Sequence, residues 1–240
     1  METKLILATF MSAALLSSCK KDEPATDPDL GFGYFPTATG TWVEYQVDSL
    51  WRDDPSNVLD SVSYRLLERI VEQYTDLEGR ACQRIHRFVR DEAGEWVIRD
   101  VWSATADAYA AERSEENYRK LKLSFPVRLD RRWDINALGT SAVDDPEEND
   151  ELEVEYAEVD VPWSNASLSF ERTLLVKNTV PANFVEKRNF EERYAHDVGM
   201  VEKYQEETNT QTRFDPATNT TVVEVKGWRL RMTAVAYGTE

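Results

Sequence analysis

The chain has 240 residues, of which 45 are Asp or Glu and 28 are Lys or Arg, and its formal net charge is −17 at pH 7. So acidic a protein repels nucleic-acid phosphates and anionic lipid headgroups, which argues against nucleic acid as a partner and against a basic membrane-binding patch. The length suits one domain with a sizeable core.

The N-terminus has the pattern of a secretory signal peptide. An apolar run, residues 5–16, follows a short start that contains Lys4. The run is shorter than the roughly 20 residues that a membrane-spanning helix needs. The next residues complete Leu16-Ser17-Ser18-Cys19, which resembles the bacterial lipobox, where a peptidase cleaves before a lipidated cysteine. The resemblance implies removal of residues 1–18 and a membrane anchor of acyl chains on Cys19.

A tether is expected between the lipid and the folded domain. Lys20-Lys21-Asp22-Glu23 resembles the sorting signal of surface lipoproteins in the Bacteroidota, although a generic polar tether fits equally well. Residues 24–33 contain two prolines and two glycines and read as a flexible linker. We therefore expect a tether over 19–33, a single domain over 34–240, and an outer-membrane location on either the periplasmic or the cell-surface face.

The first part of the domain alternates between apolar and polar residues, which predicts half-buried strands. Trp42–Leu50 is the clearest case. Val62–Tyr74 is predicted as a strand, although its aliphatic spacing also fits a helix. Arg80–Arg90 and Glu95–Ser103 flank Asp91-Glu92-Ala93-Gly94, which predicts a hairpin.

The alternation stops between Ala104 and Asn117, where a short helix or an irregular crossover is expected. It resumes at Tyr118–Phe125, and an acidic loop follows at 144–151. A change of phase after Tyr156 predicts a β-bulge near Ala157.

The C-terminal part predicts strands at Phe184–Tyr194 and Val198–Glu206, followed by a long hairpin that spans Tyr204–Tyr237. In total we expect ten to twelve strands joined by short turns. The predicted fold is all-β and mainly antiparallel, as a single curved sheet or open half-barrel, with a β-sandwich as the alternative.

Four stretches together resemble a family of Bacteroidota lipoproteins that has no established activity. The likeness covers nearly the whole mature chain and implies class and location, but no catalytic residue. It also resembles, in architecture alone, the half-barrels of lipoprotein carriers, which hold acyl chains on a concave apolar face. The stretches are Tyr34–Tyr45, Lys122–Asn136, Tyr194–Val201 and Gly227–Gly238.

Few residues suggest chemistry. The two histidines, His86 and His196, are interpreted as structural, and Cys82 as a buried small hydrophobe, which leaves no partner for a disulfide once Cys19 is lipidated. The acidic loop 144–151 lacks the spacing of a calcium site and is read as solvated. No nucleophile elbow, zinc helix or phosphate loop is present, so we predict no catalytic residue, no metal and no cofactor.

Five of the seven tryptophans fall in predicted strands and are expected to close the core, because a sugar-binding platform would need exposed rings. They are Trp42, Trp96, Trp102, Trp133 and Trp228. Asp48-Ser49-Leu50 and Asp60-Ser61-Val62 resemble the Asp-Ser/Thr-apolar O-glycosylation pattern of the Bacteroidota, although a chain rich in Asp and Ser is expected to contain such a match by chance.

Three functional hypotheses follow. The first is a non-catalytic binding module for a hydrophobic ligand or an envelope component, and a hydrophobic ligand would need a concave apolar face with no plug. The second is a structural lipoprotein that contacts other proteins through strand edges or loops. The third and least favoured is a hydrolase, which would need converging carboxylates with raised pKa values in a cleft.

Overall fold

All twelve strands belong to one antiparallel sheet. The computed structural model describes residues 28–139, 151–180 and 183–240, with a single short 3₁₀ turn at Phe32–Tyr34. The first six strands are β1 (Thr41–Asp53), β2 (Val58–Thr75), β3 (Ala81–Arg90), β4 (Trp96–Ala106), β5 (Ala110–Glu115) and β6 (Tyr118–Ser124). The last six are β7 (Arg132–Asp134), β8 (Glu153–Ser164), β9 (Ser169–Asn178), β10 (Glu186–Ala195), β11 (Gly199–Asp215) and β12 (Thr220–Thr239).

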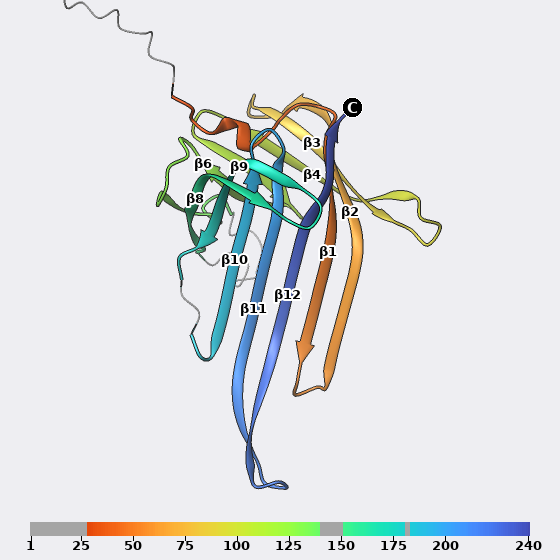
Figure 1. Ribbon diagram of the computed structural model, residues 1–240, viewed down its shortest axis with the longest axis vertical. Helices are drawn as coiled ribbons and strands as arrows, with labels where there is room; N and C mark the ends of the chain where they lie inside the picture. The colour runs from red at the N-terminus through yellow and green to blue at the C-terminus, as the bar shows by residue number, and fades with distance from the viewer. Residues whose placement is uncertain (1–27, 140–150, 181–182) are drawn as a thin grey trace, which may run out of the picture.

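The sheet is a meander folded back on itself. Its order is β6-β5-β4-β3-β2-β1-β12-β11-β10-β9-β8-β7, so the first and last strands of the chain pair at the centre and β6 and β7 form the two edges. The edges meet, because the Leu121 amide donates to the Ile135 carbonyl at 2.8 Å and Trp133 Nε1 donates to the Leu121 carbonyl at 2.9 Å. The result is a nearly closed barrel (Figure 1), which confirms the all-β curved sheet and rules out the sandwich.

The core lies inside the upper part of this barrel, as the alternation predicts. On β1, Val43, Tyr45 and Val47 are buried while the residues between them are only partly so. Tyr45 also donates from its hydroxyl to the Met200 carbonyl at 2.8 Å and so ties β1 to β11 across the interior. The hydrophobic cluster draws residues from both halves of the meander, so the two halves share one core.

Five strands extend well beyond the core. The ends of β1, β2, β10, β11 and β12 project from the lower rim of the barrel (Figure 1), and we call this projecting sheet the blade (residues 49–63, 186–189 and 205–230). At its far end β11 and β12 pair only with each other, from Gln211 to Glu224. The described chain begins at the opposite, upper end.

The expectation of a helix or crossover over Ala104–Asn117 is wrong, because β5 occupies this region. The β5–β6 hairpin turns at Glu116 and Asn117, whose φ angles are 48° and 70°. The alternation was hidden because the inward-facing positions of β5 are small or charged, as at Ala111 and Arg113, rather than large and apolar. The predicted bulge near Ala157 is confirmed by a register shift between Tyr156 and Glu158.

Residues 28–33, which were assigned to the tether, contact the barrel. Asp29 forms a 2.7 Å ion pair with Arg172, and the Leu30 carbonyl accepts from the Val127 amide at 3.0 Å. Phe32 packs edge-on against Phe125 with ring centroids 4.8 Å apart. The part of the predicted tether before residue 28 lies outside the described residues.

Candidate functional site

Paired charges lie inside the barrel, among the buried core residues. On one side Lys122 Nζ lies 2.5 Å from Glu192 and 3.2 Å from Glu115. On the other side Glu68 accepts from Arg87 and from Arg113, both at 3.0 Å. Both Lys122 and Glu192 are at least 98 % buried, so each needs the other's charge to offset its desolvation.

The interior network shifts the pKa values of its members. Burial alone would raise the pKa of Glu115 and Glu192, but Lys122 and Lys203 reverse this effect and hold both below their usual range. Desolvation raises the pKa of the Tyr194 hydroxyl, which donates to Glu192 at 2.6 Å. These carboxylates are therefore ionised and fully paired, the opposite of the raised-pKa acid that the hydrolase hypothesis requires.

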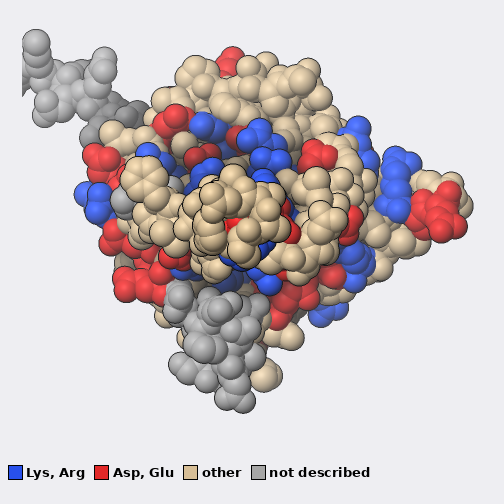
Figure 2. Space-filling model, turned by 90° about the horizontal axis from the view of Figure 1, so that it is seen from below, with Lys and Arg blue, Asp and Glu red and all other residues tan. Residues whose placement is uncertain are grey.

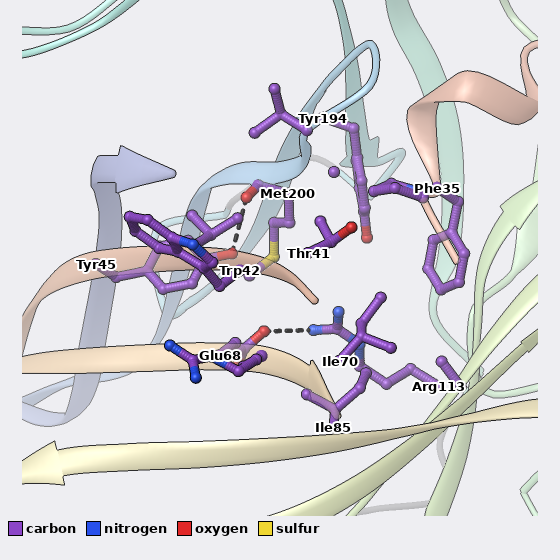
Figure 3. Close-up of a pocket in the computed structure, with 16 residues that line it drawn as sticks. Phe35, Thr41, Trp42, Tyr45, Glu68, Ile70, Ile85, Arg113, Tyr194 and Met200 are labelled. Carbon is purple, nitrogen blue, oxygen red and sulfur yellow. Dashed lines mark hydrogen bonds and ion pairs between the residues drawn. The ribbon is translucent and has the colours of Figure 1, made fainter. Parts of the chain in front are cut away.

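The interior leaves little room for a ligand. Beside the Glu68–Arg113 pair a cavity of about 50 Å³ is bounded by Phe35, Tyr45, Ile70, Arg113 and Met200 (Figure 3). This volume holds a water or two, at roughly 30 Å³ each, but no acyl chain. The predicted concave apolar cradle is thus absent from the described part of the barrel, because paired charges and large core side chains fill the space that it would need.

The blade carries the more open concave surface. A row of paired residues crosses all five of its strands, from Asp60 on β2 through Trp51, Trp228 and Glu207 to Arg188 on β10. Residues directly opposite in antiparallel strands share a face, and this row continues the face that is buried inside the barrel. A groove of about 620 Å³ lies over it, within the size range of ligand pockets.

Two tryptophans in this groove differ from the others. Trp51 is 45 % exposed and Trp228 is partly exposed. Among the described residues neither has a ring contact, a cation over its face or a hydrogen bond to its indole nitrogen. The other five each pack against a ring, a cation or the barrel: Trp42 on Gly238, Trp96 under Arg90, Trp102 under Arg87, Trp133 on Tyr156 and Trp163 on Phe170.

Polar groups surround the pair of indoles. Arg188 Nε lies 3.4 Å from Glu207, and Lys226 lies 3.1 Å from Asp53. The side chains of Asp60, Glu186 and Asn209 make no hydrogen bond or ion pair within the described ranges, and all three are exposed. The groove therefore offers two flat apolar faces together with unused donors and acceptors. Seen from the blade end, basic and acidic side chains are interspersed (Figure 2).

Gly227 makes the close approach of β11 and β12 possible beside Trp228. Its φ is 151°, and a Cβ at this position would lie 2.0 Å from the Glu207 carbonyl oxygen. Only glycine fits such a site. The pairing of β11 with β12 in the groove therefore requires glycine at position 227.

The other residues singled out from the sequence do not gather at one place. His86 packs edge-on against Phe88, whereas His196 lies 2.9 Å from Asp197 at the opposite end of the molecule from the blade. Cys82 is buried and free, as expected. The lipidation residue Cys19, and the acidic loop 144–151 up to residue 150, lie outside the described residues.

The expectation that five tryptophans close the core is largely wrong. Only Trp133 of the five is buried, while Trp42, Trp96, Trp102 and Trp228 are each partly exposed. The strands that hold them exist, but alternation predicts only on which face of the sheet a side chain lies. It does not predict whether that part of the strand lies in the barrel or extends beyond it. Trp51 directly follows the predicted strand Trp42–Leu50 and was not singled out from the sequence, whereas β1 continues to Asp53.

Over 28–139, 151–180 and 183–240, no group of three or more His, Cys, Asp or Glu side chains is arranged to hold a metal ion. The same part of the chain contains no helix long and apolar enough to cross a membrane.

Comparison with known proteins gives two structural neighbours. Neither a family model nor a curated protein matches the sequence. A candidate exported protein with a YmcC-like fold from Bacteroides fragilis has 13 % identity and a TM-score of 0.37, and a candidate lipoprotein from Parabacteroides distasonis has 12 % identity and a TM-score of 0.39. Each alignment covers 85 % of this chain and 98 % of the neighbour. With TM-scores below 0.5, the fold assignment comes from the sheet topology alone.

Proposed function

We propose that the protein is a lipid-anchored envelope lipoprotein whose barrel is a non-catalytic scaffold for a binding surface on the blade. The observation that carries this proposal is the open groove around Trp51 and Trp228, two large apolar side chains without a partner among the described residues. Exposed aromatic side chains in a concavity are typical of recognition surfaces.

The place where the described chain begins supports an anchor at one end of the molecule and a binding surface at the other. Residues 28–34 dock on the upper end of the barrel, whereas the blade projects from the lower end (Figure 1). An anchor on Cys19 would therefore hold the upper end near the outer membrane and direct the blade away from it. The filled interior favours an envelope component over a buried hydrophobic ligand as the bound partner.

Two measurements test the proposal. Replacement of Cys19 by Ser removes the thioether site, so the protein should leave the membrane fraction or remain uncleaved. A photocrosslinker at Asn209, in the groove, should then capture an envelope component in cells that express the anchored protein, and a crosslinker at Glu78, in the β2–β3 turn, is the control. Unchanged membrane fractionation of the serine variant would contradict the anchor, and equal labelling from both positions would contradict the blade site.

A second candidate is a structural interaction lipoprotein. Residues Val58–Arg65 of β2 pair with β1 on one side, and β3 pairs with β2 only from Leu66 onward. Val58, Leu59 and Val62 on this free edge are 42–71 % exposed. An open apolar edge is a template for strand addition by another protein. Crosslinks confined to Ser61, with none from Asn209, would favour this function over the groove.

A further inference from the structure

We infer that the groove of the blade binds a neutral oligosaccharide. This inference rests on the proposed binding function and names the chemical class of its ligand. A sugar ring presents apolar C–H faces together with hydroxyl groups that donate and accept hydrogen bonds. The groove combines the complementary features, two indole faces and unpaired polar side chains, on one surface.

The two indoles are placed as a platform. Trp51 and Trp228 are directly opposite on β1 and β12, but no ring contact joins them, so each can present a face to a ligand. The adjoining row toward the barrel, with Val62, Ser49 and Leu230, closes that side of the platform with smaller side chains. Five strands at about 4.8 Å spacing make the surface roughly 19 Å wide, enough for several sugar units.

The polar groups favour a ligand without net charge. Three cations line the groove, and all three are already paired: Lys187 with Glu206, Arg188 with Glu207 and Lys226 with Asp53. With Asp60 and Glu186, five carboxylates therefore stand against three cations around the indoles. The unused groups are the carboxylates of Asp60 and Glu186 and the amide of Asn209, which suit hydroxyl donors and acceptors. A polyanion would be repelled by this excess of carboxylates, and an acyl chain would leave them unpaired.

The test uses the full-length lipidated protein in detergent and three neutral hexasaccharides, cellohexaose, xylohexaose and mannohexaose, with polygalacturonate as a charged comparison. We expect at least one hexasaccharide to bind with a Kd under about 1 mM, measured by calorimetry, and to change tryptophan fluorescence. Polygalacturonate should bind at least tenfold more weakly.

Matched variants locate the site. Trp51→Ala and Trp228→Ala should each weaken binding at least tenfold, and Trp51→Phe should retain part of it because a flat ring remains. Trp96→Ala, on the β3–β4 hairpin away from the groove, should leave affinity unchanged. Because Trp51 is 45 % exposed and lies outside the core, its loss should leave the fold intact, and circular dichroism checks this.

The outcomes distinguish the saccharide inference from the proposed binding function of the blade. Binding of no hexasaccharide, or binding that both alanine variants retain, would overturn the saccharide inference. If Asn209 still crosslinks an envelope protein in that case, the binding function stands with a protein as its ligand. Absence of both saccharide binding and crosslinks would overturn the inference and the blade function together.

Discussion

At the scale of single residues, the barrel depends on charges that it buries in pairs. Lys122, Glu192 and Glu115 could not be placed from sequence, because a Lys or Glu in an alternating strand is normally assigned to the solvent side. Here they face inward, where each charge is offset by another within about 3 Å. Pairing, rather than apolar character, decides which side of the strand is inside.

These carboxylates predict loss of stability in acid. The pKa values of Glu115 and Glu192 are lower in the folded protein than the ordinary value of 4.5, so the unfolded chain takes up protons first as the pH falls. Their contribution is complete above about pH 4.5 and declines below it, through the pKa of the folded state. Urea unfolding between pH 3 and 7 should show this decline.

Glu115→Gln provides the comparison for that measurement. The variant should be less stable at pH 7, because Lys122 and Lys203 lose a partner, but its stability should fall less steeply below pH 4.5. A slope equal to that of the parent protein would show that other carboxylates cause the acid sensitivity.

Gly227 gives a second prediction at this scale. A methyl group there meets the Glu207 carbonyl, and the φ of 151° is unfavourable for alanine. Gly227→Ala should cost about 1–3 kcal/mol or force β11 and β12 apart, which hydrogen exchange of the Trp228 amide would detect. Gly79→Asn is the control, because its turn position has no neighbour within 4 Å and asparagine tolerates its φ of 81°. Equal effects of the two changes would contradict the close-approach argument.

At the scale of elements, strand length separates scaffold from binding surface. β1, β2, β11 and β12 are 13 to 20 residues long, and only part of each contributes to the core. The rest of each strand forms backbone hydrogen bonds with its neighbours, but solvent reaches its side chains on both faces of the sheet. Such segments add surface without adding much to the stability of the barrel.

The far end of the β11–β12 hairpin should therefore be dispensable for folding. Replacement of residues 211–224 by an Asn-Gly turn joins Thr210 to Val225, which are already opposite each other. The melting temperature should change by only a few degrees, because no core residue is removed. A loss of cooperative unfolding would show that the blade and the barrel fold as one unit.

At the scale of the whole molecule, the barrel closes where its edge strands β6 and β7 meet, a contact that we call the seam. Between β6 and β7 the ladder is replaced by isolated bonds, of which Trp133 Nε1 to the Leu121 carbonyl is one. Trp133 is also buried against Tyr156, so its ring and its N–H act at the same place.

Trp133→Phe keeps a ring at the seam and removes the donor. The partly buried Leu121 carbonyl loses a partner, and the variant should lose about 1 kcal/mol in chemical denaturation, with faster exchange of amides along β6. Trp163→Phe, whose ring is stacked on Phe170 away from this seam, should leave β6 exchange unchanged. Unchanged β6 exchange in Trp133→Phe would mean that the seam does not depend on this bond.

The sequence by itself determined the all-β class, most strands and turns, and the bulge near Ala157, because alternation and turn residues act locally. It also carried the lipobox at Cys19, which no part of the described structure addresses. Only the tertiary structure decided that β5 is a strand, that paired charges lie inside the barrel, and that Trp51 and the partly exposed Trp228 share one surface. The physical reason is that the burial of a strand residue depends on where the neighbouring strands end. In addition, the partners that stabilise a buried charge lie on strands that are distant in sequence.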